Sequence, residues 1–327
     1  MKILIKILKW TGIVLVALIA ILTTTIASRQ NLKFEAPYPD IKASKDSAVI
    51  ARGKFFVYGP AHCAYCHTKL DKWQDVEAGK ELPLTGGHLF DFPPGKMYSR
   101  NLTPDKETGI GNLSDSEIAR ALRYGVGHDG RALFDLMPFH NVSDEDLTAI
   151  ISYLRSTEPV KNEVPENKFN MLGNIVKAFL LKPTGPDPTI EVPVNSPKPD
   201  TTVEYGRYMA QSVANCRGCH TERDLKTGAY IGPFYGGGLK IPSEIDLTVM
   251  ISTPNITTDP NFGRLASWTQ KDFINRFREG RKFPASIMPW GPFSRMTDIE
   301  LIAIYKFLKT IPPVPNNPGP SLSPIEF

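Results

Sequence analysis

The four cysteines of this chain lie in two short pairs, and each pair is followed directly by a histidine. Residues 63–67 read Cys-Ala-Tyr-Cys-His and residues 216–220 read Cys-Arg-Gly-Cys-His. Two thiols one helical turn apart can form thioethers with the two vinyl groups of a porphyrin, and the next histidine then lies beneath the iron. The pattern predicts two covalently bound haem c groups. The predicted thioether residues are Cys63, Cys66, Cys216 and Cys219, and the predicted proximal iron ligands are His67 and His220.

A Cys-x-x-Cys pair is also found in redox-active dithiols and in zinc sites. A redox dithiol does not require the histidine that follows both pairs. A single zinc site would have to bring together two pairs whose first cysteines are 153 residues apart. We therefore interpret both pairs as haem attachment sites.

The surroundings of the two pairs repeat, which indicates an internal duplication. Gly53 and Gly206 each lie ten residues before the first cysteine of a pair, and Asn101 and Asn255, downstream, are 154 residues apart. The spacing is thus kept over most of a domain. We predict two tandem helical domains of the class I cytochrome c type, at residues 45–157 and 201–315.

Local signals predict matching helices in the two repeats. Capping residues at Ser114 and Thr269 open one helix in each, and Ser143 and Thr297 open the last helix, where apolar residues recur at helical spacing. Strand signals are sparse. The expected fold class is mainly α, with each domain a small helical bundle around its haem.

The sixth ligand of each iron is predicted from position. Met137 and Met288 are each followed by proline, and they lie 70 and 68 residues after His67 and His220. A thioether is a soft neutral ligand that raises a haem potential relative to a second imidazole. In the first repeat His140 is the main alternative, followed by the three other histidines His62, His88 and His128; the second repeat has none besides His220.

The N-terminus predicts a membrane anchor. Three lysines precede an apolar run from Trp10 to Ala27, which is long enough to cross a bilayer as a helix. The positive N-terminal side favours a cytoplasmic N-terminus, with the haem domains on the periplasmic side of the inner membrane. We therefore expect a single-pass anchor at residues 1–30, then a linker at 31–44. A cleaved signal peptide is the alternative.

A proline-rich linker is expected at residues 158–200, since the stretch from Ser156 to Asp200 holds eight prolines. We expect a C-terminal tail at residues 316–327. Within the linker, the apolar segment 169–181 predicts a short amphipathic helix. We expect this helix to pack across the two domains. Docking to a partner or to the bilayer surface is the alternative.

Several further motifs are shared with a known family: residues 101–105 (Asn-Leu-Thr-Pro-Asp), 109–111, 119–125, 129–130, 137–138 with 143–146, and 169–171. From about Gly53 to Leu308 the chain resembles the cytochrome c subunits of bacterial membrane-bound alcohol, gluconate and related sugar dehydrogenases. The resemblance implies that the Cys-x-x-Cys-His and Met-Pro elements hold haem. Those subunits carry three haems, whereas this chain has two attachment motifs and an N-terminal anchor.

These features predict an electron-transfer protein rather than an enzyme. The expected redox partners are a dehydrogenase or quinol-oxidising complex as donor and a terminal oxidase or soluble cytochrome as acceptor. The net charge of +4 and the lack of a basic run argue against nucleic acid as a partner. A di-haem peroxidase and a haem subunit of a terminal oxidase are the alternatives. Cations near the predicted haem loops are candidates for propionate or partner contacts, with solvated surface charge as the alternative: Lys96, Arg100, Arg281 and Lys282.

Overall fold

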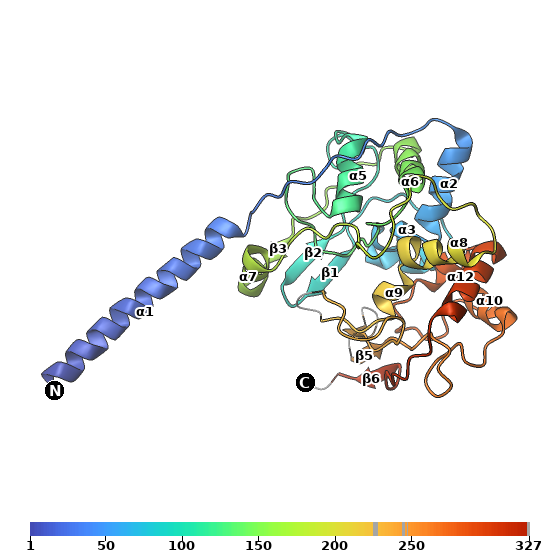
Figure 1. Cartoon of the computed structure of the whole chain (residues 1–327). Helices are drawn as coiled ribbons and strands as arrows, with labels where there is room; N and C mark the ends of the chain where they lie inside the picture. The colour runs from blue at the N-terminus through green and yellow to red at the C-terminus, as the bar shows by residue number, and fades with distance from the viewer. Residues whose placement is uncertain (225–227, 244–245, 247, 326–327) are drawn as a thin grey trace.

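The computed structural model describes residues 1–224, 228–243, 246 and 248–325 (Figure 1). The predicted ranges 201–315 and 316–327 therefore each include positions outside the described residues. The chain is mainly helical, with one long helix, α1 (Lys2–Arg29), projecting from a folded body. We call residues 31–182 the N-terminal half of this body and residues 201–325 the C-terminal half.

In both halves a first helix, the short helix of the Cys-x-x-Cys pair, a middle helix and a last helix follow in the same order, whereas the helices Trp73–Glu77 and Trp290–Ser294 have no counterpart at the same place. Those of the N-terminal half are α2 (Ser47–Tyr58), α3 (Cys63–Cys66), the short 3-10 turn η1 (Leu70–Lys72), α4 (Trp73–Glu77), α5 (Asp115–Tyr124) and α6 (Asp144–Ser156). Those of the C-terminal half are α8 (Val203–Tyr208), its π-helical continuation η2 (Met209–Val213), α9 (Cys216–Cys219), α10 (Gln270–Arg278), α11 (Trp290–Ser294) and α12 (Asp298–Thr310).

Side-chain caps fix where the predicted helices begin. Ser114 caps α5 and Thr269 caps α10, each in a reciprocal capping box with the acidic residue three positions later. Ser143 caps α6 through the amide of Asp146, and Thr297 caps α12 in a third such box. The four helix starts predicted from sequence are confirmed.

Two glycines let the first and last helices of each half cross at close range. A Cβ atom at Gly53 would lie 1.9 Å from the carbonyl oxygen of Ala149, so α2 touches the backbone of α6. A Cβ atom at Gly206 would lie 1.9 Å from the carbonyl oxygen of Ala303, so α8 touches α12 in the same way. The glycine of each repeat is thus explained by a helix crossing that admits no side chain.

Two small antiparallel sheets were not expected from the sequence. One has the order β1-β2-β3, formed by β1 (Leu89–Phe92), β2 (Gly95–Tyr98) and β3 (Lys168–Phe169). The other has the order β4-β5-β6, formed by β4 (Lys240–Pro242), β5 (Val249–Ser252) and β6 (Leu322–Pro324). Strands of two to four residues are too short to show an alternating pattern. In both sheets the third strand comes from a remote segment.

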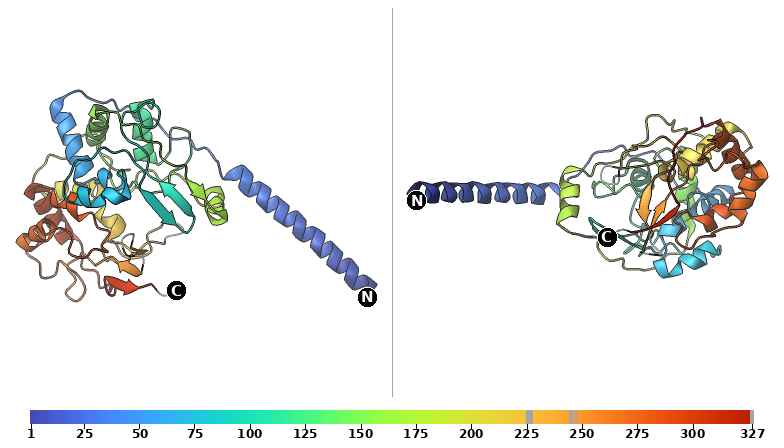
Figure 2. Two further views of the ribbon diagram at one scale, coloured as in Figure 1. Left: turned by 180° about the vertical axis from the view of Figure 1, so that it is seen from behind. Right: turned by 90° about the horizontal axis from the view of Figure 1, so that it is seen from below.

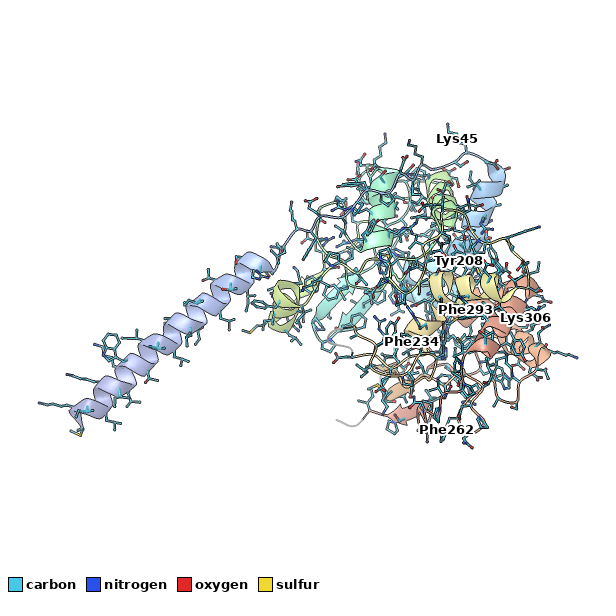
Figure 3. All side chains as sticks on the ribbon, in the orientation of Figure 1. Lys45, Tyr208, Phe234, Phe262, Phe293 and Lys306 are labelled. Atoms are coloured by element: carbon cyan, nitrogen blue, oxygen red, sulfur yellow. The ribbon has the colours of Figure 1, made fainter. Side chains whose placement is uncertain are left out.

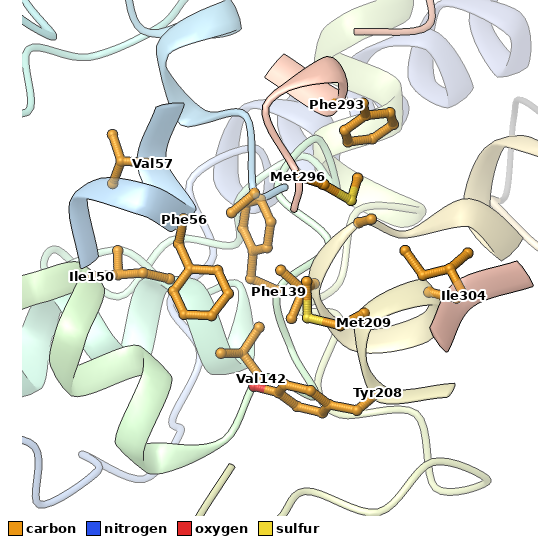
Figure 4. Close-up of a cluster of buried hydrophobic side chains, with 14 of the residues drawn as sticks. Phe56, Val57, Phe139, Val142, Ile150, Tyr208, Met209, Phe293, Met296 and Ile304 are labelled. Carbon is orange, nitrogen blue, oxygen red and sulfur yellow. The ribbon is translucent and has the colours of Figure 1, made fainter. Parts of the chain in front are cut away.

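Buried apolar side chains form one cluster that extends through both halves (Figure 4). Phe56, Phe139 and Ile150 from the N-terminal half lie near Met209 and Met296 from the C-terminal half. These residues are all less than 9% exposed. The two halves therefore share one continuous core, and burial of this apolar surface holds them together.

Helix α1 is the one described helix that is long and apolar enough to cross a membrane, with a mean hydropathy of 2.2. The segment after it is extended and fastened to the body, since the Phe34 amide donates to the carbonyl of Gly130 (2.7 Å) and buried Arg120 donates to the carbonyl of Phe34 (3.0 Å). The short apolar helix of the linker is α7 (Met171–Phe179). The packing that we expected for it was wrong: it lies against α1 and β3, at one edge of the N-terminal half, rather than between the halves (Figures 1 and 2).

Candidate haem sites

The two Cys-x-x-Cys-His motifs adopt the same local structure. Each begins after a residue in the left-handed region, His62 (φ 42°) or Asn215 (φ 50°), and then forms a single helical turn, α3 or α9. The amides of His67 and His220 each donate to the carbonyl of the first cysteine of the motif, at 2.9 Å. Both motifs thus place their two thiols one turn apart and their histidine at the end of that turn.

Both motif histidines are held by a hydrogen bond from the ring. Nδ1 of His67 lies 2.8 Å from the carbonyl oxygen of Arg100, and Nδ1 of His220 lies 2.9 Å from that of Pro254. A carbonyl only accepts, so Nδ1 carries the proton and Nε2 keeps its lone pair. Burial lowers the pKa of His67 to about 4 and also lowers the pKa of His220. Neutral imidazoles with an available Nε2 are the form that ligates iron.

The loops that supply these carbonyls are fastened by equivalent asparagines. Asn101 Nδ2 donates to the carbonyl of Val160 (2.8 Å), and Asn255 Nδ2 donates to the carbonyl of Val314 (2.8 Å). Each Oδ1 accepts from the backbone amide two residues later, at 3.0 and 2.9 Å. The repeated asparagines therefore position the acceptors of the two histidines by joining each loop to the segment after the last helix of its half.

The four cysteines form no disulfide with one another, and their environment differs from that of a redox dithiol. Burial raises the pKa of Cys63 and of Cys216 to about 12. A reactive dithiol needs a lowered thiol pKa. Among the residues that the structure describes, no three His, Cys, Asp or Glu side chains form a cluster that could hold a metal ion. The geometry gives no support to the zinc alternative.

The two predicted methionine ligands lie in equivalent turns. The Phe139 amide donates to the Met137 carbonyl (2.8 Å), and the Trp290 amide donates to the Met288 carbonyl (2.7 Å). Both methionines are partly buried against the shared core. The two methionines thus occupy equivalent turns in the two halves. Ligation of iron by Met137 and Met288 stays a prediction.

The main histidine alternative is engaged elsewhere. Nδ1 of His140 lies 3.0 Å from the carbonyl of Arg123 and its Nε2 lies 3.1 Å from Asp135 Oδ1, so both ring nitrogens have hydrogen-bond partners. His128 is exposed, and the ring of His62 packs edge-on against Phe293. The structure therefore disfavours His140 and His128 as iron ligands.

Two arginines with largely buried side chains lie beside the sites: Arg281, which the sequence offered as a candidate for propionate or partner contacts, and Arg217, which it did not. Arg217, inside the second motif, pairs with Asp187 and lies between the rings of Tyr230 and Phe234 (5.3 and 4.8 Å to the centroids). The Nε atoms of Arg217 and Arg281 are buried and have no hydrogen-bond partner among the described residues. An orphaned buried N–H is costly, and an anionic group such as a haem propionate would satisfy it.

Arg281 also connects the two sites. It forms an ion pair with Glu77, and it donates to Tyr65 Oη of the first motif (3.0 Å) and to the carbonyl of Met288 (3.2 Å). The second oxygen of Glu77 accepts from the Gly291 amide (2.7 Å). One buried cation thus joins the first attachment motif to the loop of the second methionine.

Comparison with known proteins identifies relatives of the chain. No protein-family model matches the chain. The alcohol dehydrogenase (quinone) cytochrome c subunit of Gluconacetobacter polyoxogenes is 28% identical over 84% of this chain and 58% of its own length. The fructose dehydrogenase cytochrome subunit of Gluconobacter japonicus is 26% identical over 90% of this chain and 58% of its own length. The chain is homologous to cytochrome c subunits of dehydrogenases.

One of the subunits of nicotinate dehydrogenase from Pseudomonas putida is 33% identical over 68% of this chain, but the chain spans only 18% of that protein. The chain thus covers less than two thirds of each relative named here. The homology implies covalently bound haem c and an electron-transfer role, in line with the two attachment motifs.

Proposed function

We propose that this chain is a membrane-anchored di-haem cytochrome c. It transfers single electrons from a dehydrogenase or quinol-oxidising complex to a terminal oxidase or soluble cytochrome, and it is not itself the catalytic subunit. The observation that carries the proposal is that both motif histidines direct Nδ1 to a backbone carbonyl at equivalent positions. A redox dithiol has no role for an imidazole whose Nε2 is kept for a metal. A zinc site would need further ligands, and among the described residues no three His, Cys, Asp or Glu side chains gather to form one.

The proposal assigns eight residues to the two groups. Cys63 and Cys66 form the thioethers of the first haem, and Cys216 and Cys219 those of the second. His67 and Met137 would bind the iron of the first haem, and His220 and Met288 would bind that of the second. Haem c supplies reversible one-electron reduction of its iron when it is bound.

The protein's own contribution is to keep each ligand in one state. The carbonyls of Arg100 and Pro254 hold the Nδ1 protons, so each imidazole keeps its orientation and its ligating nitrogen. A methionine on the sixth position leaves no open coordination site, which favours electron transfer over ligand chemistry. The contacts of Arg281 with Glu77, Tyr65 and the Met288 carbonyl link the two sites directly.

Membrane attachment completes the proposal. In this proposal helix α1 is a single-pass anchor in the inner membrane, and the lysines before its apolar run favour an orientation with the haem-binding body on the periplasmic side. Anchoring next to membrane-bound redox enzymes keeps the cytochrome at a high local concentration for its donor and acceptor.

The haem content tests the proposal directly. The full chain is expressed in a host that matures c-type cytochromes, and haem per chain is measured by alkaline pyridine spectra and intact mass. We expect two haems in the parent, one in Cys63→Ala/Cys66→Ala, and one in Cys216→Ala/Cys219→Ala. Protein that is colourless, or that shows four thiols after denaturation and reduction, would refute the assignment.

The redox role is tested separately by affinity purification of the tagged full chain from membranes. We expect a dehydrogenase, a quinol-oxidising complex or an oxidase to co-purify and to exchange electrons with the haem bands. Fast turnover of hydrogen peroxide with a reductant, and no electron exchange with such a complex, would contradict the electron-transfer role.

A further inference from the structure

Helix α7 presents its large apolar side chains to the outside and its small ones to the protein. Gly173 and Ala178 are buried, and a Cβ atom at Gly173 would lie 2.1 Å from the carbonyl oxygen of Pro94. On the outer face, Met171 is 69% exposed and Leu172 is 49% exposed. The next turns add two more exposed residues, Phe179 (41%) and Leu180 (51%).

The apolar and the buried faces of α7 are the reverse of those expected for a helix at a water-exposed surface. A surface helix of a soluble protein buries its apolar stripe against the core and exposes polar residues. Here the apolar residues at positions 171, 172, 175, 176, 179 and 180 recur at helical spacing on one side, and none of them is fully buried. The outer face of α7 therefore needs an apolar covering that lies outside the chain.

The position of α7 identifies that covering. It packs against the C-terminal end of α1, where Arg29 Nε donates to the carbonyl of Ala178 (3.2 Å) and the Arg29 guanidinium lies 5.7 Å from the centre of the Phe179 ring. The apolar run of α1 from Trp10 to Ala27 is about 27 Å long at 1.5 Å per residue, close to the hydrocarbon thickness of a bilayer. Arg29 thus lies at the level of the lipid headgroups, and so does α7.

The direction of α7 fits the same location. In the right-hand view of Figure 2, α7 lies crosswise to α1 at its C-terminal end. A helix across the end of a spanning helix runs along the membrane surface. Figure 3 shows the side chains of the projecting helix α1 pointing outward along most of its length.

Basic residues accompany the apolar face. Lys177 lies over the ring of Phe169 (4.8 Å), and the exposed Lys182 follows the helix. Lys33 and Arg131 pair through their backbones nearby, and Arg131 also forms a surface ion pair with Asp129 (3.0 Å). Cations beside an apolar stripe favour an interface that contains anionic lipid headgroups.

We propose that α7 is an interfacial helix that lies in the outer surface of the bilayer crossed by α1. Its outer face, residues 171, 172, 175, 176, 179 and 180, inserts between lipid headgroups and acyl chains. The proposal rests on the membrane anchoring proposed above, and it adds that the haem-binding body has one fixed orientation on the membrane. The partner surface for redox proteins is then on the sides that α7 leaves exposed.

Photo-crosslinking of the full haem-loaded chain in nanodiscs of phosphatidylethanolamine and phosphatidylglycerol tests this. p-Benzoylphenylalanine replaces Leu172 or Leu180 on α7, and lipid adducts are measured by mass spectrometry after irradiation. The matched controls are Val16 in the middle of α1, which is 67% exposed, and Ile299 on α12, which is 43% exposed on the body.

We expect lipid adducts at Leu172 and Leu180 to be at least about 10-fold more abundant than at Ile299, and within about 3-fold of those at Val16. Adducts at Val16 without adducts on α7, or crosslinks of α7 to a protein instead of lipid, would overturn the interfacial helix while leaving the anchor intact. Absence of adducts at Val16 would overturn both. The visible spectrum of the same samples reports haem binding independently, so failure of the cytochrome assignment is distinguished from either result.

Discussion

Replacement of Arg281 by glutamine should weaken the contact between the two halves of the protein. Arg281 forms a buried ion pair with Glu77, and their side chains are only 9% and 13% exposed. It also donates to Tyr65 Oη and to the carbonyls of Met288 and Ser286. Glutamine is too short to make these contacts and carries no charge.

The size of the effect follows from burial. Loss of one member of a buried ion pair typically costs about 3–5 kcal/mol, because the other charge is left without compensation. Glu77 keeps its hydrogen bond from the Gly291 amide (2.7 Å) in the variant. We therefore expect a loss of about 3 kcal/mol in the free energy of unfolding, at the lower end of that range.

The neighbouring residue provides a matched control. Lys282 pairs with Glu279 at 2.7 Å, but the two side chains are 51% and 45% exposed. Exposed pairs contribute about 0–1 kcal/mol, so Lys282→Gln should be nearly neutral. Guanidinium chloride unfolding of the haem-loaded proteins in detergent, followed by far-ultraviolet circular dichroism, measures both variants.

A double-mutant cycle with Glu77→Gln isolates the pair. The coupling between Arg281 and Glu77 should exceed about 1 kcal/mol, as expected for residues in direct contact. If Arg281→Gln is no more destabilising than Lys282→Gln, or if the two changes at the buried pair simply add, then burial does not make this ion pair important.

Three further changes test other parts of the molecule. Gly206→Ala places a Cβ 1.9 Å from the carbonyl of Ala303, so α8 must move from α12; we expect a loss near the upper end of the usual range of about 1–3 kcal/mol for overpacking, measured as a lower Tm. Met137→Ala should abolish the weak far-red methionine–iron band of one oxidised haem, whereas His140→Ala should leave the band unchanged; the opposite result would reverse the ligand assignment. The backbone amide of Ser114, the N-cap of α5, donates to the Glu117 carboxylate and lowers the pKa of this carboxyl below its ordinary 4.5. As the pH falls, Glu117 is therefore protonated first in the unfolded chain, and the free energy of unfolding decreases until the pH has passed the lower pKa of the folded state. Glu117→Gln should therefore lose less Tm than the parent when the pH is lowered through that range.

The local features of this protein were predictable because they depend on neighbours in the chain. Each Cys-x-x-Cys-His motif holds two thiols and an imidazole within five residues, so its spacing is complete in the sequence. The caps at Ser114 and Thr269 bond amides only three positions away, which makes the helix starts equally local. The duplication could also be inferred from the sequence, because equivalent residues of the two repeats lie at nearly the same distance from each other along the chain.

The contacts between the halves were not predictable in this way. Arg281 and Tyr65 are 216 positions apart, and Arg281 and Glu77 are 204 apart, so no spacing rule relates them. The sequence marked Arg281 only as one of several cations near a loop. Burial in the shared core, which depends on how two folded halves meet, is what distinguishes it from the exposed Lys282.

Helix α7 separates the two kinds of information most clearly. The helical spacing of its apolar residues could be recognised from the sequence, and so could the length of the apolar run in α1. Which face of α7 meets the protein is decided by tertiary packing, because only Gly173 allows the helix backbone to approach the Pro94 carbonyl. A short-range pattern shows that a helix has two faces, and the long-range contacts decide which of them stays exposed.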